Sequence, residues 1–150
     1  MKKTAKFIFT GIFYFLLASS CNAQSSAQSI IDKFFSDYEK SGPKESVENV
    51  YKTNPWMTKI SDDIITVKNK FAAYDEELVG KYFGYVFVDK VETSDCFAIY
   101  TYLMKFDRQP LRITFMFYKP DTKWRLFAFQ FDDSFDDDFE KALIWKYSIK

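Results

Sequence analysis

The hydrophobic pattern of this 150-residue chain changes near its middle from helical spacing to strand-like alternation. This change limits the folds open to the chain. In residues 27–79 apolar side chains recur every three or four positions, as in helices that bury one face. In residues 82–131 aromatic and β-branched residues alternate with a period of two, as in strands. Helices that precede strands, without a repeated strand–helix–strand unit, predict an α+β fold rather than a parallel nucleotide-binding sheet.

Three helices are expected in the first half. The first covers residues 27–39, and the second begins at Pro43, which suits the first turn of a helix. The second ends at Asn54-Pro55, because the residue before a proline avoids helical geometry. The third begins at the capping sequence Ser61-Asp62-Asp63 and runs to Val79-Gly80, where glycine is a common stop.

The second half predicts an antiparallel sheet of about four strands, followed by a short C-terminal helix. The strands are expected at residues 82–91, 96–106, 111–118 and 124–131, and the helix at residues 134–145. The segment from Lys119 to Lys123 contains proline and aspartate and predicts a hairpin turn. In the fourth strand, alternation places Leu126 and Ala128 on one face and Phe127 and Phe129 on the other.

The N-terminus has the pattern of a secretory signal peptide. Three lysines precede an uncharged apolar run at residues 7–18, and small residues follow it. Cleavage after Ala23 would leave residues 24–150 as a single exported domain in the periplasm or outside the cell. Alternatively, Ala18-Ser19-Ser20-Cys21 resembles a bacterial lipobox. In that case residues 1–20 are the leader, and lipidated Cys21 is the membrane anchor of a lipoprotein.

The composition excludes several kinds of function. The chain has no histidine, which removes Ser-His-Asp and Cys-His triads and histidine metal sites. Without its leader lysines the chain carries a net charge of about −3, which gives no electrostatic basis for binding nucleic acid. Cys96 is the only cysteine after Cys21, so no internal disulfide is expected in the domain, and Cys96 is expected to be a buried structural thiol. No glycine-rich phosphate loop is present, and neither a cofactor nor a metal is expected.

The order of the predicted helices and strands, together with four short segments, resembles that of a known superfamily. The relevant segments are Phe34-Phe35-Ser36-Asp37-Tyr38 before Gly42, the helix at residues 46–50, Asn54-Pro55-Trp56, and Lys123-Trp124-Arg125-Leu126. Over residues 27–132 the chain resembles the nuclear-transport-factor-2-like, or cystatin-like cone, superfamily. Within that superfamily it is similar to small exported bacterial members with no assigned activity.

The resemblance implies a strongly curved sheet that curls around the helices and leaves a cavity at its wide end. It also implies a choice between isomerase-like or cyclase-like enzymes and non-catalytic binding or dimerising modules. Tyr38 matches a first-helix tyrosine that some of the enzymes use as an oxyanion donor. No residue matches their general-base aspartate with certainty, and the His-Asp pair of the dehydratases is absent.

Aromatic residues supply the main candidates for a ligand pocket. Tyr100, Tyr102 and Tyr118, together with Arg112, would form an amphipathic wall on the strands. Tyr38 and Trp124 complete the set of pocket candidates. The competing interpretation is core packing, because strands favour aromatic residues.

Two charged segments are further candidates for binding. The acidic run from Asp132 to Glu140 could supply oxygen ligands to calcium, but its spacing is not that of an EF-hand and favours a solvated tail. Arg108 and Arg112 could grip a carboxylate, but surface ion pairs are the commoner outcome.

The sequence thus predicts an exported non-catalytic domain that binds a small apolar or amphipathic ligand or a protein partner. Both faces of the later strands are largely apolar, so the second face is expected to be covered by a homodimer partner or by the C-terminal helix. That helix would use Phe139, Leu143, Ile144 and Trp145. The alternative is an isomerase-like, cyclase-like or hydrolase-like enzyme that uses Tyr38 and a cavity carboxylate. A third hypothesis is a secreted inhibitor or immunity protein that acts through its surface.

Overall fold

A computed structural model describes residues 26–57 and 61–135, where helices precede a single antiparallel sheet. The helices are α1 (Ala27–Ser41), α2 (Pro43–Tyr51), α3 (Ser61–Ala72) and α4 (Glu76–Val79). The strands are β1 (Tyr82–Thr93), β2 (Phe97–Phe106), β3 (Leu111–Tyr118) and β4 (Arg125–Asp132). The predicted α+β class is confirmed.

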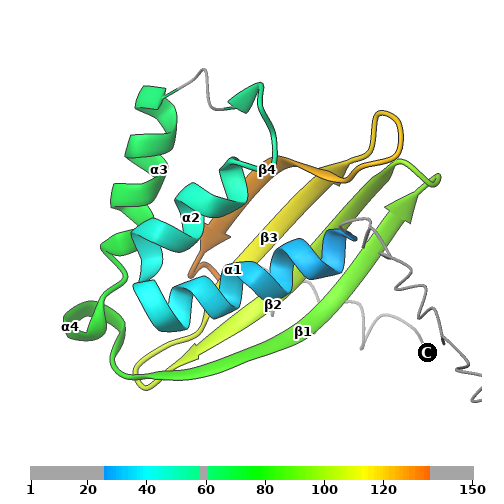
Figure 1. The fold of residues 1–150 in the computed structure, drawn as a ribbon. Coiled ribbons are helices and arrows are strands. Elements are labelled where there is room, and N and C mark those ends of the chain that lie inside the picture. The colour runs from blue at the N-terminus through cyan, green and yellow to red at the C-terminus, as the bar shows by residue number, and fades with distance from the viewer. Residues whose placement is uncertain (1–25, 58–60, 136–150) are drawn as a thin grey trace, which may run out of the picture.

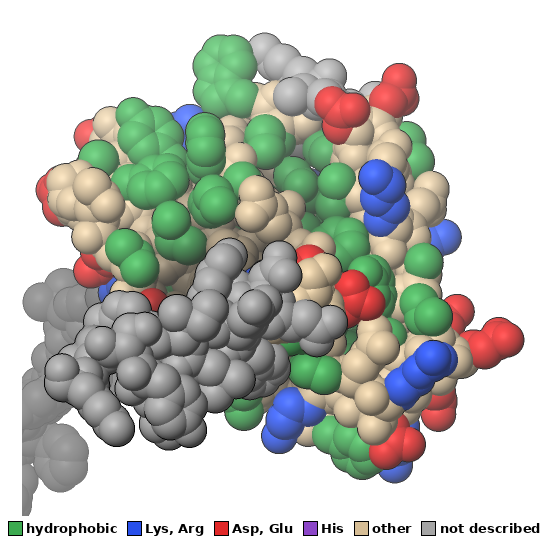
Figure 2. Space-filling model, turned by 180° about the vertical axis from the view of Figure 1, so that it is seen from behind, with side chains coloured by type: hydrophobic (Ala, Val, Ile, Leu, Met, Phe, Trp, Pro, Cys, Tyr) green, Lys and Arg blue, Asp and Glu red, His purple; other side chains and the backbone are tan. Residues whose placement is uncertain are grey.

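The sheet is a meander in the order β1-β2-β3-β4, and each strand is antiparallel to the next. It curls around α1 without closing into a barrel (Figure 1). The helices lie on one face of the sheet, so the alternating side chains of β2 and β3 divide into a buried inner set and a more accessible outer set. Seen from behind, hydrophobic side chains gather on the outer face (Figure 2).

Helix α1 follows the expected pattern closely. The Ser26 hydroxyl caps the first turn, because its oxygen accepts a hydrogen bond from the Ser29 amide at 3.0 Å. The apolar positions of the helix, from Ala27 to Phe35, are buried against the sheet. The helix ends at Gly42, whose φ of 88° lies in a region that favours glycine.

The third helix is shorter than predicted. We expected one helix from Ser61 to Val79-Gly80, but α3 ends at Ala72 and the separate short helix α4 begins at Glu76. The cause is Asp75, whose carboxylate accepts a hydrogen bond from the Leu78 amide at 3.0 Å. An aspartate that caps a new first turn competes with continuation of the preceding helix.

The prediction for the two faces of β4 was also wrong. The pairing of β3 with β4 shifts between Met116–Ala128 and Phe117–Leu126, which leaves Phe127 as an extra residue. Leu126 and Phe129 are therefore both buried, whereas Phe127 is 54% exposed.

Phenylalanine side chains fill the space between α1 and the sheet. The Phe34 ring lies 5.0–6.0 Å from the rings of Phe35, Phe71, Phe115 and Phe129, measured between centroids. Each of these side chains is buried. The centre of the molecule is thus a packed aromatic core, and grooves for a ligand lie at its margins.

Several predictions fall outside the described residues: the leader, Cys21, most of the acidic run and the helix at residues 134–145. Among the helices of residues 26–57 and 61–135, none combines the length and apolar character needed to span a membrane. Cys96, expected to be buried, is only partly so, and its sulfur lies 3.1 Å from the Ser94 hydroxyl.

Candidate functional site

A groove of about 530 Å³ lies between α1, α2 and the beginning of β4, and we call it the helix groove. Its lining is Ser29, Ile30, Lys33, Phe34, Asp37, Asn49, Val50, Thr53, Pro55, Lys123, Trp124 and Arg125. Apolar side chains of the two helices and Trp124 supply one part of this lining. Three cationic side chains and a single carboxylate supply most of the rest. The groove therefore combines an apolar surface with a net positive rim.

The carboxylate of the helix groove is already bound by its neighbours. Asp37 accepts from the Lys33 Nζ at 2.6 Å and from the Asn49 Nδ2 at 2.9 Å. Partial burial raises the pKa of Asp37, but these hydrogen bonds and the charge of Lys33 outweigh it and lower the pKa below its ordinary value. Asp37 is thus a fixed anion that joins α1 to α2. Lys123 and Arg125 are the cations of the rim that lie on the strand side of the groove.

The strand side of the helix groove is held in place by the segment that follows α2. The Asn54 Nδ2 donates to the Leu126 carbonyl at 2.8 Å, and the Leu126 amide donates to the Thr53 hydroxyl at 3.2 Å. The Lys119 Nζ lies 5.1 Å from the centroid of the Trp124 ring, within cation–π range. These contacts fix the positions of Trp124 and Arg125 relative to α2.

A second, shallower groove of about 470 Å³ lies beside the first turns of α1, over β1 and β2, and we call it the edge groove. It is lined by Gln28, Asp32, Tyr85, Phe87, Lys90, Tyr100 and Tyr102. The Gln28 side chain bonds to both the Tyr102 hydroxyl at 3.1 Å and the Asp32 carboxylate at 2.8 Å. Tyr85 stacks on Phe35 with 3.6 Å between ring centroids and 7° between planes, so its ring is held flat against the core.

The six predicted pocket residues do not form one site. Tyr100 and Tyr102 line the edge groove, whereas Trp124 lines the helix groove. Tyr118 is exposed at the end of β3.

Tyr38 lies apart from both grooves. Its ring packs 5.8 Å from Phe71 and 5.1 Å from Tyr82, measured between centroids. Burial raises the pKa of Tyr38 to about 12. Within residues 26–57 and 61–135, no carboxylate forms a hydrogen bond with its hydroxyl, so the tyrosine–carboxylate pair of the enzyme hypothesis is not assembled there.

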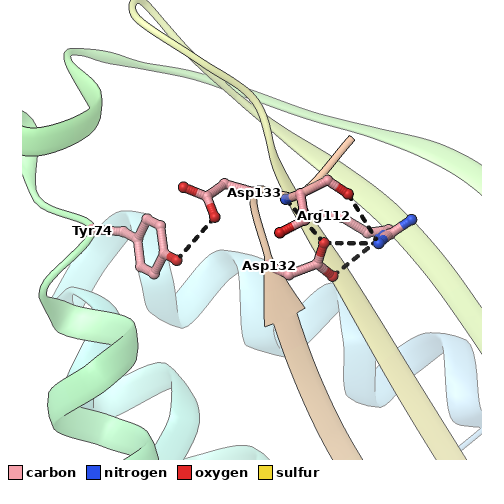
Figure 3. A network of polar contacts seen from close by, with 5 residues as sticks. Tyr74, Arg112, Asp132 and Asp133 are labelled. Carbon is pink, nitrogen blue, oxygen red and sulfur yellow. Dashed lines mark hydrogen bonds and ion pairs between the residues drawn. The ribbon is translucent and has the colours of Figure 1, made fainter. Parts of the chain in front are cut away.

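Arg112 belongs to a polar network at the end of β4, drawn in Figure 3. Its Nε and Nη2 donate to the two carboxylate oxygens of Asp132 at 3.0 and 2.7 Å, and Nη2 also lies 3.5 Å from the Ser134 carbonyl. Asp133 accepts from Gln109 and, at 3.5 Å, from the Tyr74 hydroxyl. Burial and the nearby Asp133 charge raise the pKa of Tyr74. This network fastens the end of β4 to β3 and lies outside both grooves.

The other expected charged sites are likewise occupied by internal contacts. Arg108 donates to the Leu78 carbonyl at 3.1 Å, so Arg108 and Arg112 do not act as a pair. In the described part of the chain, no cluster of three or more His, Cys, Asp or Glu side chains is arranged to hold a metal ion.

The sequence did not identify the charged and amide residues of the helix groove as site residues: Lys33, Asp37, Asn49, Lys123 and Arg125. One signal was available, because Lys33 and Asp37 are four residues apart on α1 and next to its buried face. The approach of Lys123 and Arg125 depends on how the β3–β4 hairpin packs against α2, which no local pattern reveals.

No family model, curated protein or solved structure matches this chain. The resemblance to the cone superfamily therefore stays a prediction. The two grooves are the features from which a function can be inferred.

Proposed function

We propose that this protein is a non-catalytic binding module whose helix groove takes a small amphipathic acid. The ligand would have an apolar body and one anionic group. The observation that carries this proposal is the combination, in one groove, of buried apolar side chains with a rim that has three cations and one carboxylate already paired.

The size of the groove supports a small ligand. Pockets for small molecules usually enclose roughly 300–1,000 Å³ and are mainly apolar, with a few polar groups that fix orientation. The helix groove, at about 530 Å³, falls within this range. Ile30, Phe34 and Val50 offer an apolar floor that is continuous with the core.

The charges support an anionic head group. Lys33 is paired with Asp37, so the net positive charge of the rim comes from Lys123 and Arg125. An arginine can bind a carboxylate through two parallel hydrogen bonds, and a lysine adds a point charge. The ligand's acid group is therefore expected on the strand side of the groove, with its apolar body towards the helices.

Binding is favoured over catalysis by the position of Tyr38. The enzyme alternative needs Tyr38 and a carboxylate to converge on one bound atom, whereas Tyr38 packs among aromatic rings away from both grooves. The basic and apolar N-terminal sequence supports export of the module, either free or anchored through Cys21.

The test compares two ligands with the same apolar chain and opposite charge. The full chain is titrated by calorimetry with decanoate and with decyltrimethylammonium. We expect decanoate to bind at least about tenfold more tightly, because the rim attracts an anion and repels a cation. Equal affinities, or preference for the cation, would refute an acid-binding groove.

Charge reversal tests whether Lys123 and Arg125 cause the preference for decanoate. The double variant Lys123→Glu/Arg125→Glu is expected to lose the preference for decanoate. The double variant Lys70→Glu/Lys105→Glu is the matched control, because it reverses two exposed charges, on α3 and β2, that are not part of the groove. An equal loss in the control would mean that overall charge, and not the helix groove, governs binding.

A further inference from the structure

The strand β1 is the longest in the sheet and the most exposed. In the described sheet it has β2 on one side and no strand on the other. Six of its apolar side chains are 37–55% exposed: Phe83, Tyr85, Val86, Phe87, Val88 and Val91. Such an apolar open edge is a template for pairing with another strand.

At the opposite edge of the sheet, side chains of the helical half cover part of the edge strand β4. On β4, the side chains of Thr53 and Asn54 bond to the backbone amide and carbonyl of Leu126. On β1, the Lys90 amide donates to the Asp89 carboxylate, which covers the edge only towards the end of the strand. The stretch from Gly84 to Val88, which is centred on Val86 and ends before Asp89, is therefore the part of β1 best suited to pairing; β1 is labelled in Figure 1.

We propose that two copies of this chain form a homodimer by antiparallel pairing of their β1 strands about a twofold axis near Val86. This goes beyond ligand binding, because the helix groove lies between α1, α2 and β4 and includes no residue of β1. The edge groove, which contains Tyr85 and Phe87, would lie next to its copy across the axis.

The shape of β1 favours a second copy as the occupant. The pairing with β2 shifts between Tyr82 and Tyr85 and again between Phe87 and Asp89. Gly84 and Val88 lie within these shifts, at equal distances in sequence from Val86. Bulges bend a strand, so a partner must have matching curvature. A twofold axis near Val86 places each bend opposite its counterpart.

The charges along β1 favour the antiparallel direction. Lys81 directly precedes the strand, and Asp89, Lys90 and Glu92 stand towards its end. The Lys90 Nζ pairs with a Glu92 carboxylate oxygen at 2.7 Å, so Asp89 is the acid of this end that gives it a net negative charge. Antiparallel pairing brings Lys81 of one copy towards the acidic end of the other. Parallel pairing would instead place like charges together, which is unfavourable.

The exposed area is sufficient for a dimer. A fully covered aromatic side chain buries roughly 150–250 Å², so half-exposed Phe83 and Phe87 each offer on the order of 100 Å². With the other four apolar side chains the strand offers about 500 Å² per copy, or about 1,000 Å² in the pair, which reaches the lower bound for a specific interface.

The test is the oligomeric state of the full chain, measured by sedimentation and by light scattering at concentrations up to about 100 μM. We expect the wild type to form a dimer. Val86→Lys and Val86→Glu, each alone, are expected to weaken it at least about tenfold, because like charges meet at the axis. An equimolar mixture of the two variants is expected to restore a dimer, since opposite charges then face each other across the axis.

Phe127→Lys is the matched control, because Phe127 is 54% exposed on the other edge strand. Circular dichroism confirms that each variant is folded. A wild type that is monomeric throughout would overturn the proposal. So would a dimer that Phe127→Lys disrupts and Val86→Lys does not, or a failure of the Val86→Lys and Val86→Glu mixture to associate.

Discussion

At the scale of single residues, Phe34 packs the helices α1 and α3 against the strands β3 and β4. It is 1% exposed, and its ring meets four other aromatic rings that come from α1, α3, β3 and β4. Replacing it with alanine removes these contacts and leaves a cavity that rigid neighbouring rings fill poorly. We predict that Phe34→Ala lowers the free energy of unfolding by about 3–5 kcal/mol.

Urea denaturation measures this loss. Phe127→Ala is the control, because Phe127 is a phenylalanine on the surface, and it is expected to lower the free energy of unfolding by less than about 1 kcal/mol. Equal losses in the two variants would contradict the placement of the core.

Glu48 gives a prediction about pH. Its carboxylate pairs with Lys68 of α3 and with Lys52 at 2.9 Å. The hydrogen bonds from Lys68 and then Lys52 hold the pKa of Glu48 at about 2. The pKa of Glu48 is lower in the folded state than its ordinary value of about 4.3. The ion pairs of Glu48 therefore stabilise the folded state fully when the pH is above this ordinary value. This stabilisation is lost as the pH falls through the folded value.

Thermal unfolding of the wild type and of Glu48→Gln, followed from pH 7 to pH 2, measures this contribution. The variant is expected to melt a few degrees lower at neutral pH, and the difference is expected to close as the solution becomes acidic. A difference that stays constant with pH would exclude the ionised pair as its cause.

At the scale of elements, Gly80 determines how the helical half joins the sheet. Its φ of 83° favours glycine, and a Cβ atom there would lie 2.8 Å from the Asp107 Cβ and 3.1 Å from the Arg108 nitrogen. Gly42, between α1 and α2, has a similar φ of 88° but nothing within 4 Å of an added Cβ. A side chain at either position would therefore strain the backbone, and the two positions differ in the space available for that side chain.

We predict that Gly42→Ala lowers the free energy of unfolding by about 1–3 kcal/mol from backbone strain alone. Gly80→Ala is expected to cost at least about 1 kcal/mol more, because the added methyl group also displaces the β2–β3 turn. Denaturant titration of both variants measures the difference. Equal losses in the two variants would show that the β2–β3 turn moves to accommodate the added methyl group without loss of stability.

The element scale also shows what local sequence patterns can predict. Helix α1 was predicted to within a few residues, because its cap and its buried face are encoded within the helix. The break at Asp75 was missed because the apolar spacing continues through it. The reversal of faces in β4 was missed because a bulge at Phe127 is a property of strand pairing and not of one strand's sequence.

At the scale of the whole molecule, prediction of the site was partial. Tyr100 and Tyr102 were grouped from the sequence and both line the edge groove, since alternation places residues i and i+2 of one strand on the same face. Arg112 was offered as a ligand contact, but its partner Asp132 stands opposite it on β4, and only the register of the sheet reveals the pair. The helix groove joins residues from two helices and a strand, so its cations could not be grouped from the sequence.

Nuclear magnetic resonance tests directly whether an amphipathic acid binds in the helix groove. Decanoate is added to the isotopically labelled full chain. The largest shifts are expected at the Trp124 indole and at the amides of Lys33, Asn49 and Arg125, which line the groove. Shifts centred on Phe87 and Lys90 of the edge groove, or no saturable shifts, would contradict binding in the helix groove.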